Sequence, residues 1–443
     1  MKLRGKQIAI LGAGSSGIAA AALAVREGGV VTAYDNGDAE RLAGAVASFA
    51  ALGVNLYTAN EALNPEGQFD LTVISPGIDL AWPIAQTFAE RSMELIGEIE
   101  FAWRFCDAPV IAITGTNGKT TTTTLIDEMI RAAGLNSVAA GNIGLPFSEV
   151  VRSEVHYDWI VLEVSSFQLE TIVRFSPSVA IWVNFAPDHL DRYADLEAYR
   201  QAKLRIFLNR TATQLAIVKA EDNLGLDGSV TTFSAFSDEG NWCYREGGIL
   251  EHRDNGRRFS FENCELLGKH NAENVMAALA VAERLGLDWG KVDDCISRFR
   301  PPAHRCEKVG EKDGVIYVND SKSTNLHSLA SALRGQVSPV VLIAGGKDKG
   351  LNFGELREEV AERVRAVVCL GEIKEHLMSS WSDLLPCHPV DSVPDAVAKA
   401  RELAESGDLV LFSPGTSSFD MFSGYVARGD AFREAVTSLS ESV

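Results

Sequence analysis

The residues best suited to chemistry lie in one glycine-rich run, TGTNGKTTTTT, at 114–124. It follows an apolar stretch at 110–113 that is typical of a buried strand, and it precedes a helical pattern that stops at Gly134. Backbone N–H groups of such a loop can surround phosphate oxygens, Lys119 can neutralise their charge, and the Thr120 hydroxyl can bind Mg²⁺. Ile113 stands where the strict phosphate-loop pattern has its first glycine, so this is a variant loop. The alternative is an ordinary turn with a solvent-facing lysine. The predicted nucleotide-binding residues here are Gly115, Thr116, Asn117, Gly118, Lys119, Thr120 and Thr121.

A second chemical signal is an acid inside an apolar segment. Glu163 lies in WIVLEV, which reads as a buried strand at 159–164. A buried unpaired carboxylate is costly, so Glu163 needs a cation, and Mg²⁺ beside the phosphate loop would supply one. An internal salt bridge is the alternative. His189 follows the next predicted strand, at 179–184, where it is a candidate metal ligand or phosphate contact.

The N-terminal segment contains another glycine turn. A predicted strand at 7–11 leads into GAGSSG at 12–17, an alanine-rich helix to about Glu27, and a strand at 30–34 that ends at Asp35. This order is typical of a nucleotide-binding α/β unit, because the glycines let backbone N–H groups approach a phosphate at a helix N-terminus. A glycine turn that only packs a helix against a strand is the alternative.

Strands and helices alternate along most of the chain, which predicts an α/β fold with largely parallel sheets. Predicted strands in the last third lie at 315–318, 340–344, 366–370 and 409–412, whereas residues 208–265 are less regular and are left open. Paired prolines at 301 and 302 suggest a boundary and a hinge on which the last domain swings. We therefore expect three domains: a Rossmann-like domain at 1–98, a central phosphate-loop ATPase-type domain with a mostly parallel sheet at 99–302, and a Rossmann-like α/β domain at 303–443.

Composition limits the class of protein. The 443 residues are 46% apolar and 23% charged, a balance typical of globular proteins. With 60 acidic and 41 basic residues the net charge is −19, which argues against a non-specific nucleic-acid binder. The seven cysteines form no C-x-x-C pair, and no apolar run reaches the roughly 18 residues of a membrane helix. We expect a cytoplasmic monomer with reduced thiols and no membrane or nucleic-acid partner.

Nine motifs in register carry a resemblance that extends over residues 8–430. They are TGTNGKTTT, GNIG, LEVSSFQLE, NFAPDHLDRY, YRQAKLRIF, HNAENVMAAL, PAHRCE, NDSKSTN and SPGTSSFDMF. In this set and order they resemble the Mur ligase family, ATP-dependent amide ligases of cell-wall precursor synthesis. SSFQLE, DHLDRY and NDSKSTN are most similar to the members that add D-glutamate to UDP-N-acetylmuramoyl-L-alanine.

The resemblance implies a mechanism and residue roles. ATP phosphorylates the substrate carboxylate, and an amine attacks the resulting acyl phosphate. Two Mg²⁺ are implied, with Lys203 converted to a carbamate that can face a metal. The implied catalytic residues are Lys119, Glu163, His189 and Lys203, and the implied metal-binding residues are Thr120, Glu163, His189 and carbamylated Lys203. The further nucleotide-binding residues are Asn274 near adenine, Arg305 on the phosphates and Asp320 at the edge of the third domain.

The resemblance also implies three groups of substrate-binding residues. The uridine diphosphate group is assigned to Ser15, Ser16, Asp35, Asn36 and Gly77. The muramoyl part is assigned to Asn142 and Ser165. The D-glutamate pocket is assigned to Lys322, Thr324, Lys349, Ser418 and Tyr425, with Lys347 as an alternative to Lys349.

Other functions stay open on the sequence alone. Within the same class, the chain is alternatively a Mur-type ligase for another amino acid or a folylpolyglutamate synthetase. GAGSSG with Asp35 also suggests a nicotinamide-dependent oxidoreductase, but that function explains neither the phosphate loop nor Glu163. A regulatory ATP-binding switch protein is a third class.

Overall fold

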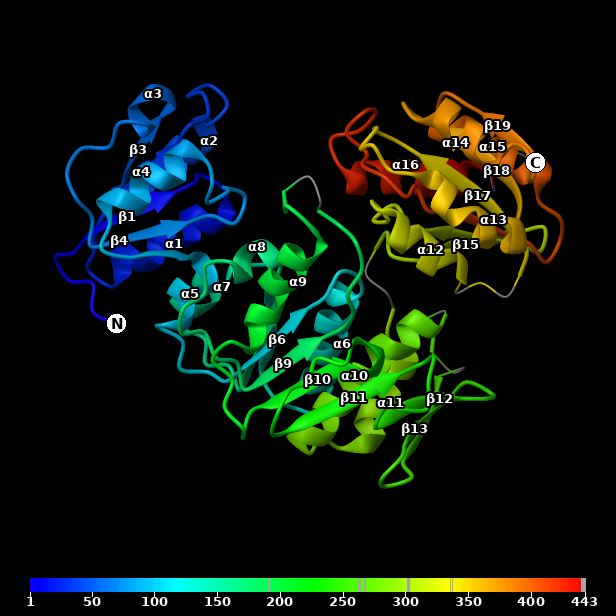
Figure 1. Ribbon diagram of the computed structural model, residues 1–443, viewed down its shortest axis with the longest axis horizontal. Helices are drawn as coiled ribbons and strands as arrows, with labels where there is room; N and C mark the ends of the chain where they lie inside the picture. Colours follow the sequence, from blue (N-terminus) through cyan, green and yellow to red (C-terminus); the bar gives the residue numbers. More distant parts are fainter. Residues whose placement is uncertain are drawn as a thin grey trace.

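The computed structural model describes residues 1–189, 192–261, 264–266, 268–300, 303–334, 336 and 338–439. Three separate sheets build three lobes, as Figure 1 shows in blue, cyan to green, and yellow to red. The expected α/β class is confirmed. No helix in the described ranges has the length and apolar character needed to cross a membrane.

The N-terminal sheet is wholly parallel, in the order β3-β2-β1-β4-β5. Gly17 explains why the glycine turn is tight, because a Cβ there would lie 1.9 Å from the carbonyl oxygen of Gly12. The strands are β1 Gln7–Leu11, β2 Val30–Asp35, β3 Asn55–Thr58, β4 Leu71–Ile74 and β5 Leu95–Gly97. The helices are α1 Ser15–Arg26, α2 Ala43–Ala51, α3 Ala59–Ala62 and α4 Pro83–Arg91.

The central sheet has the order β14-β13-β12-β11-β10-β9-β6-β8-β7. It is parallel from β7 through β12 and ends in antiparallel strands β13 and β14, so the prediction of a mostly parallel sheet is confirmed. The strands are β6 Val110–Thr114, β7 Ser137–Gly141, β8 Trp159–Glu163, β9 Val179–Trp182, β10 Leu215–Lys219, β11 Val230–Ser234, β12 Trp242–Arg245, β13 Ile249–His252 and β14 Arg258–Ser260. The helices are α5 Glu98–Trp103, α6 Lys119–Ala132, α7 Phe147–Arg152, α8 Ser166–Leu169, α9 Leu196–Leu204, α10 Lys269–Leu285 and α11 Trp289–Arg298, with 3₁₀ turns at Arg205–Phe207 and Ala220–Asp222.

The C-terminal sheet has the order β15-β16-β20-β17-β18-β19, with only the β15–β16 pair antiparallel among the described strands. The strands are β15 Glu307–Lys312, β16 Val315–Asn319, β17 Val340–Gly345, β18 Val364–Leu370, β19 Cys387–Pro389 and β20 Leu409–Phe412. The helices are α12 Leu326–Arg334, α13 Arg357–Arg363, α14 Lys374–Trp381, α15 Val393–Leu403 and α16 Tyr425–Ser438, with a 3₁₀ turn at Phe353–Leu356.

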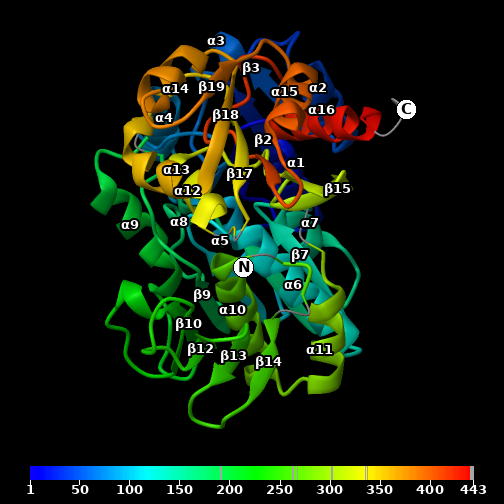
Figure 2. The same cartoon turned by 90° about the vertical axis from the view of Figure 1, so that its right-hand side faces the viewer.

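Among the described residues, the apolar cores connect the first two lobes but not the third. Leu23, Phe101 and Phe147 belong to one buried cluster that runs from the N-terminal sheet into the central one. The C-terminal sheet has its own clusters on its two faces, and Figure 2 shows that lobe as a separate layer above the central sheet. The predicted hinge at Pro301 and Pro302 lies outside the described residues.

A buried acid at the junction of the first two lobes should make stability depend on pH. Glu98 is 3% exposed; its Oε1 accepts the Ser148 N–H at 2.5 Å, and its Oε2 has no hydrogen-bond partner among the described residues. Burial raises the pKa of Glu98 from 4.5 to about 7. The folded state therefore holds a proton that the unfolded state loses first, and the free energy of unfolding falls as pH rises from about 4.5 to about 7.

We expect Glu98→Gln to flatten this dependence. Relative to the wild type, the variant should gain about 1–3 kcal/mol of stability between pH 5 and pH 8, as measured by urea unfolding at each pH. Glu154→Gln, at an exposed position, is the control and should leave the slope unchanged. Equal slopes for the wild type and Glu98→Gln would show that Glu98 is ionised in the folded protein.

Candidate active site

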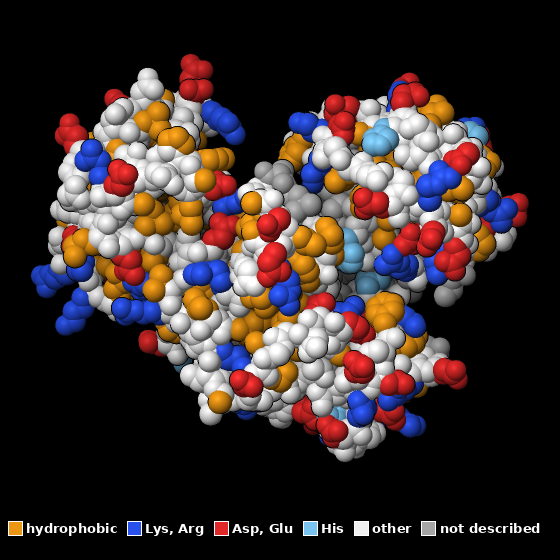
Figure 3. All heavy atoms as spheres, in the orientation of Figure 1, with side chains coloured by type: hydrophobic (Ala, Val, Ile, Leu, Met, Phe, Trp, Pro, Cys, Tyr) orange, Lys and Arg blue, Asp and Glu red, His pale blue; other side chains and the backbone are white. Residues whose placement is uncertain are grey.

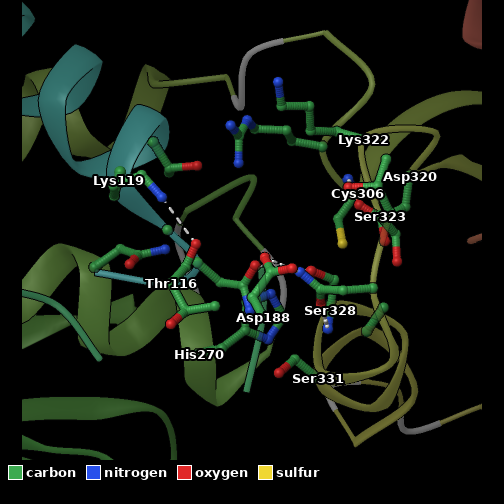
Figure 4. Close-up of a pocket in the computed structure, with 18 of the residues that line it drawn as sticks. Thr116, Lys119, Asp188, His270, Cys306, Asp320, Lys322, Ser323, Ser328 and Ser331 are labelled. Atoms are coloured by element: carbon green, nitrogen blue, oxygen red, sulfur yellow. Dashed lines mark hydrogen bonds between the residues drawn. The ribbon is translucent and has the colours of Figure 1, made fainter. Parts of the chain in front are cut away.

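Most of the predicted nucleotide and catalytic residues meet in one cleft between the central and C-terminal lobes. Figure 3 shows a deep notch between the N-terminal and C-terminal lobes, above the central lobe, and Figure 4 shows Lys119 on one wall of the cleft facing Asp320 and Lys322 on the other. The cleft contains a cavity of about 270 Å³. The predicted residues that line it are Thr116, Asn117, Gly118, Lys119, Thr121, Asn142, Glu163, His189, Asn274, Arg305, Asp320, Lys322 and Thr324.

The phosphate loop joins β6 to α6. Gly118 precedes the helix with a φ of +79°, and a Cβ there would lie 2.3 Å from Asn274 Oδ1, so only glycine fits. Lys119 Nζ donates to the carbonyl oxygens of Gly115 and Thr116, both at 2.9 Å; Figure 4 shows the second of these bonds. Burial lowers the pKa of Lys119. The ammonium is thus held at the loop, where a phosphate oxygen could replace a carbonyl as its acceptor.

Glu163 ends β8 directly beside this loop and is 2% exposed. Its oxygens accept from neutral groups, Thr120 Oγ1 at 2.7 Å and Asn142 Nδ2 at 2.8 Å. Among the described residues, the salt bridge weighed as an alternative is therefore not formed. A buried carboxylate beside a threonine hydroxyl is a donor set that suits Mg²⁺, which binds few protein oxygens when phosphates supply the others.

A second set of groups contacts the same loop and cavity, since Lys203 shares an acceptor with Lys119 and His189 lines the cavity. Lys203 is 2% exposed, and its Nζ donates to Gly115 O at 2.7 Å and lies 4.8 Å from the centre of the Tyr199 ring. Burial, followed by the charge of Lys119, lowers the pKa of Lys203 well below its usual value. His189 has a left-handed backbone with φ +55°, and its ring packs on Phe167. These groups fit a second Mg²⁺ only if Lys203 becomes an anion.

The C-terminal lobe supplies residues that reach the phosphate loop from the other wall of the cleft. The Arg305 guanidinium donates to Thr120 Oγ1 at 2.5 Å and so reaches across the cleft to the phosphate loop. Asp320 accepts from Ser413 Oγ at 2.8 Å and from the Cys306 N–H at 3.2 Å, and burial raises its pKa to about 6. Behind the loop, a second cavity of about 390 Å³ shares Asn117, Gly118, His270 and Asn274 with the first.

The residues assigned to D-glutamate only partly converge. Lys322 and Thr324 line the cleft, and Lys322 Nζ lies 3.8 Å from the centre of the Tyr425 ring. Burial lowers the pKa of Lys322 to about 8. Lys349 Nζ donates to Thr324 O at 3.4 Å, whereas Lys347 is bonded through its main chain, with its N–H donating to Ser417 O and its carbonyl oxygen accepting from the Thr416 hydroxyl. Ser418 is buried and does not line the cavity.

Of the residues assigned to the uridine diphosphate and muramoyl groups, Asn142 lines the cleft and the others lie elsewhere. Asp35 accepts the Ala13 N–H at 2.8 Å and the Gly37 N–H at 2.9 Å, so its carboxylate braces the glycine turn. Ser15 lines a separate cavity between α1 and α7. Ser165 caps α8. Ser16 is half-buried, and Asn36 and Gly77 are exposed on the N-terminal lobe.

Comparison with known proteins identifies the family. Two family models match, the Mur ligase middle domain over residues 113–282 and the Mur ligase glutamate ligase domain over residues 304–415. UDP-N-acetylmuramoylalanine–D-glutamate ligase of Geotalea daltonii is 40% identical, with 99% of each chain covered. The chain belongs to the Mur ligase family. The ligase of the same name from Geobacter metallireducens is also 40% identical, again with 99% of each chain covered.

Solved structures agree on the fold of this Mur ligase. UDP-N-acetylmuramate–alanine ligase MurC from Thermotoga maritima has a TM-score of 0.62 at 19% identity, covering 98% of this chain and 100% of that one. A pseudomurein peptide ligase type C from Methanothermus fervidus has a TM-score of 0.60 at 16% identity, with the same coverage. The three-lobed arrangement is thus shared by enzymes that differ widely in sequence.

Several cleft residues of the Mur ligase were not predicted individually. Asp188, His270 and Asn325 stand inside the quoted motifs, so their positions were marked but their side chains were not assigned. Ser328 and Ser331 lie on α12 and carried no signal, because a serine in a helical pattern is normally an exposed-face residue. The cleft-lining residues that were missed are Asp188, His270, Asn271, Cys306, Ser323, Asn325, Ser328, Ser331 and Ala332.

Proposed function

We propose that this Mur ligase uses ATP to join D-glutamate to UDP-N-acetylmuramoyl-L-alanine in peptidoglycan precursor biosynthesis. Membership of the family implies the use of ATP. One observation carries the proposal: a phosphate loop with Lys119 faces Lys322 and Thr324 across a single cleft. Phosphate-binding and carboxylate-binding groups on opposite walls are what an enzyme needs to activate one acid and bind a second one as acceptor.

The chemistry explains why a nucleotide is required. A carboxylate oxygen is a poor leaving group, so the γ-phosphoryl group moves from ADP oxygen to that carboxylate oxygen. The D-glutamate amine attacks the acyl carbon, the C–O bond to phosphate breaks, and the amine loses its proton as the amide forms. Lys119 and Arg305 stabilise negative charge on the transferring group, and loop N–H groups position it.

Thr120 and Glu163 would hold one Mg²⁺, and His189 with Lys203 would hold a second. Bound Mg²⁺ neutralises phosphate charge. Asn142 donates to Glu163 Oε1 and Thr120 donates to Oε2, so the two bonds orient the carboxylate. Asn274, assigned near adenine, is oriented by its bonds to Thr122 at 3.3 Å and Asn271 at 3.0 Å and lines both cavities.

We propose that Lys203 is carbamylated in the working enzyme. A lysine with a depressed pKa keeps a neutral amine that can attack CO₂, and the product is an anion suited to a metal. With ¹³C-labelled bicarbonate, we expect a carbamate ¹³C resonance in the wild type that is missing in Lys203→Ala. That variant should also lose activity by about 100-fold or more. Lys291→Ala, which removes an exposed lysine, should keep both the carbamate resonance and the wild-type activity. A wild-type spectrum without the resonance under turnover conditions contradicts the assignment.

The substrates are assigned to the outer lobes. The uridine diphosphate group would lie on the N-terminal lobe at Ser15, Ser16, Asp35, Asn36 and Gly77, with Asn142 and Ser165 on the muramoyl part. D-Glutamate would be held by Lys322, Thr324, Lys349, Ser418 and Tyr425. The proposal also includes three domains, at 1–98, 99–302 and 303–443. It further includes a monomeric state and a cytoplasmic location. Seven free cysteines support that location.

A coupled phosphate-release assay tests the function. With ATP, Mg²⁺ and UDP-N-acetylmuramoyl-L-alanine, D-glutamate should release phosphate, whereas L-alanine and meso-diaminopimelate should not. Release with another amino acid would favour a different Mur-type ligase, and release with a folate substrate would favour folylpolyglutamate synthetase. Phosphate release that ignores both substrates would favour a regulatory ATP switch.

A further inference from the structure

The start of α12 makes direct side-chain contacts with the phosphate loop of the other lobe. Ser328 Oγ donates to Asn117 Oδ1 at 2.7 Å, and Asn117 Nδ2 lies 2.7 Å from His327 Nδ1. Beside them, Asn325 Nδ2 donates to Asp188 Oδ2 at 2.8 Å. Figure 4 shows Ser328 and Asp188 near one another at this wall of the cavity. The C-terminal lobe is therefore tied by side chains to the loop that would bind phosphate.

The central lobe holds the same loop residue from the other side. The Asn117 N–H donates to Asn184 Oδ1 at 2.9 Å, and Asn184 Nδ2 donates back to Asn117 O at 3.0 Å. The backbone of Asn117 is thus fixed by Asn184, while its side chain is fixed by His327 and Ser328. Any shift of this loop must move α12, and any departure of α12 must release the Asn117 amide.

The hydrogen bonds also assign the protonation of His327. Because the Ser328 hydroxyl donates to Asn117 Oδ1, the amide nitrogen is the group that faces His327 Nδ1. Nδ1 must then be the acceptor, and the ring proton must lie on Nε2. In a protonated ring, the N–H at Nδ1 would face the Asn117 amide nitrogen, which is also a hydrogen-bond donor.

Burial and two nearby cations keep the ring of His327 neutral, although the charge of Asp188 acts in the opposite direction. Arg334 on the same helix, Lys219 on β10, Asp188 and His270 on α10 are the groups that act on it. Burial first, then the two cations, lower its pKa to about 4. The imidazole is therefore neutral near pH 7 and can accept from Asn117.

We propose that His327 and Ser328 are positioning residues that latch the C-terminal lobe onto Asn117, so that nucleotide binding and lobe placement are interdependent. The catalytic consequence rests on the proposed function; the latch itself does not. When His327 and Ser328 of α12 contact Asn117, the phosphate loop is already ordered. A nucleotide that orders the loop therefore also favours this position of the C-terminal lobe.

A matched pair of variants separates the latch from a packing role. In His327→Asn the side-chain oxygen can occupy the place of Nδ1, whereas in His327→Gln the amide extends to the place of Nε2. We expect His327→Gln and Ser328→Ala to weaken binding of a non-hydrolysable ATP analogue about three- to tenfold, and His327→Asn to stay within about twofold of the wild type. X-ray scattering should show a larger radius of gyration for the first two variants only. Thermal melts confirm that each variant is folded.

The tautomer provides a readout that needs no ligase activity. In the ¹⁵N-histidine spectrum of the full chain at pH 7, the resonance lost in His327→Asn should show a proton on Nε2 and a bare Nδ1. A proton on Nδ1 would overturn the latch, and so would a His327→Gln variant that matches the wild type in both nucleotide affinity and scattering. A chain that passes these tests but does not incorporate D-glutamate would contradict the proposed function alone.

Discussion

Lys119→Ala is expected to lower kcat about 10²–10³-fold, the range seen when a single donor to a developing charge is removed. The half-buried ammonium lies at the phosphate loop, where it donates to Gly115 O and Thr116 O. Alanine leaves the transferring phosphoryl group without this charge. Initial rates of phosphate release with both substrates saturating measure the effect.

A matched lysine tests whether the loss is local. Lys308→Ala removes an exposed lysine of β15 that pairs with Glu311 at 2.9 Å, and surface pairs of this kind contribute little. Its kcat should equal that of the wild type. Lys119→Arg should also lower kcat, because a guanidinium is larger than the ammonium that fits between the carbonyl oxygens of Gly115 and Thr116. If Lys119→Ala retains wild-type kcat, the loop does not handle the reacting phosphate.

Glu163→Gln is expected to lower kcat/KM by about 10²–10³ and to raise the Mg²⁺ concentration needed for half-maximal rate. The change keeps the size of the side chain and its bond to Asn142, but removes the negative charge beside Thr120. The charge of Glu163 raises the pKa of Lys119, so its loss should lower that pKa further. A Mg²⁺ titration of the rate separates the metal effect from a general loss of activity.

Glu197→Gln is the control for this variant, because Glu197 on α9 is largely exposed and 3.9 Å from Arg200. It should keep the wild-type Mg²⁺ dependence. If Glu163→Gln shows an unchanged Mg²⁺ optimum together with wild-type kcat/KM, Glu163 is a structural residue of the buried sheet and no ligand.

The buried parallel strands could be predicted from sequence, whereas several edge strands could not. The predicted strands at 7–11 and 409–412 are mostly apolar, and the structure has strands with these bounds. β3 and β15 were not predicted, because NLYT and EKVGEK present few apolar residues at the edges of their sheets. Such strands form because a neighbouring strand offers hydrogen bonds, which leaves little trace in composition.

The residues of the candidate site also divide into those that the local sequence pattern predicts and those that it does not. Lys119 and Glu163 were predicted from local pattern, since each stands out against an apolar strand or glycine loop. The contact from Arg305 to Thr120 joins residues 185 positions apart, and no spacing rule encodes it. Asp35, which the resemblance assigns to the uridine diphosphate group, accepts the N–H groups of Ala13 and Gly37, and its contact with a ligand stays a prediction.

The most direct test of the account is an isotope-transfer experiment on the activated acid. UDP-N-acetylmuramoyl-L-alanine labelled with ¹⁸O in both carboxylate oxygens is incubated with ATP, Mg²⁺, D-glutamate and the enzyme, and the released phosphate is analysed by mass spectrometry. An acyl phosphate requires that one labelled oxygen leave with each phosphate while the other stays in the new amide. Phosphate released without the label would contradict activation of the carboxylate by ATP in this cleft.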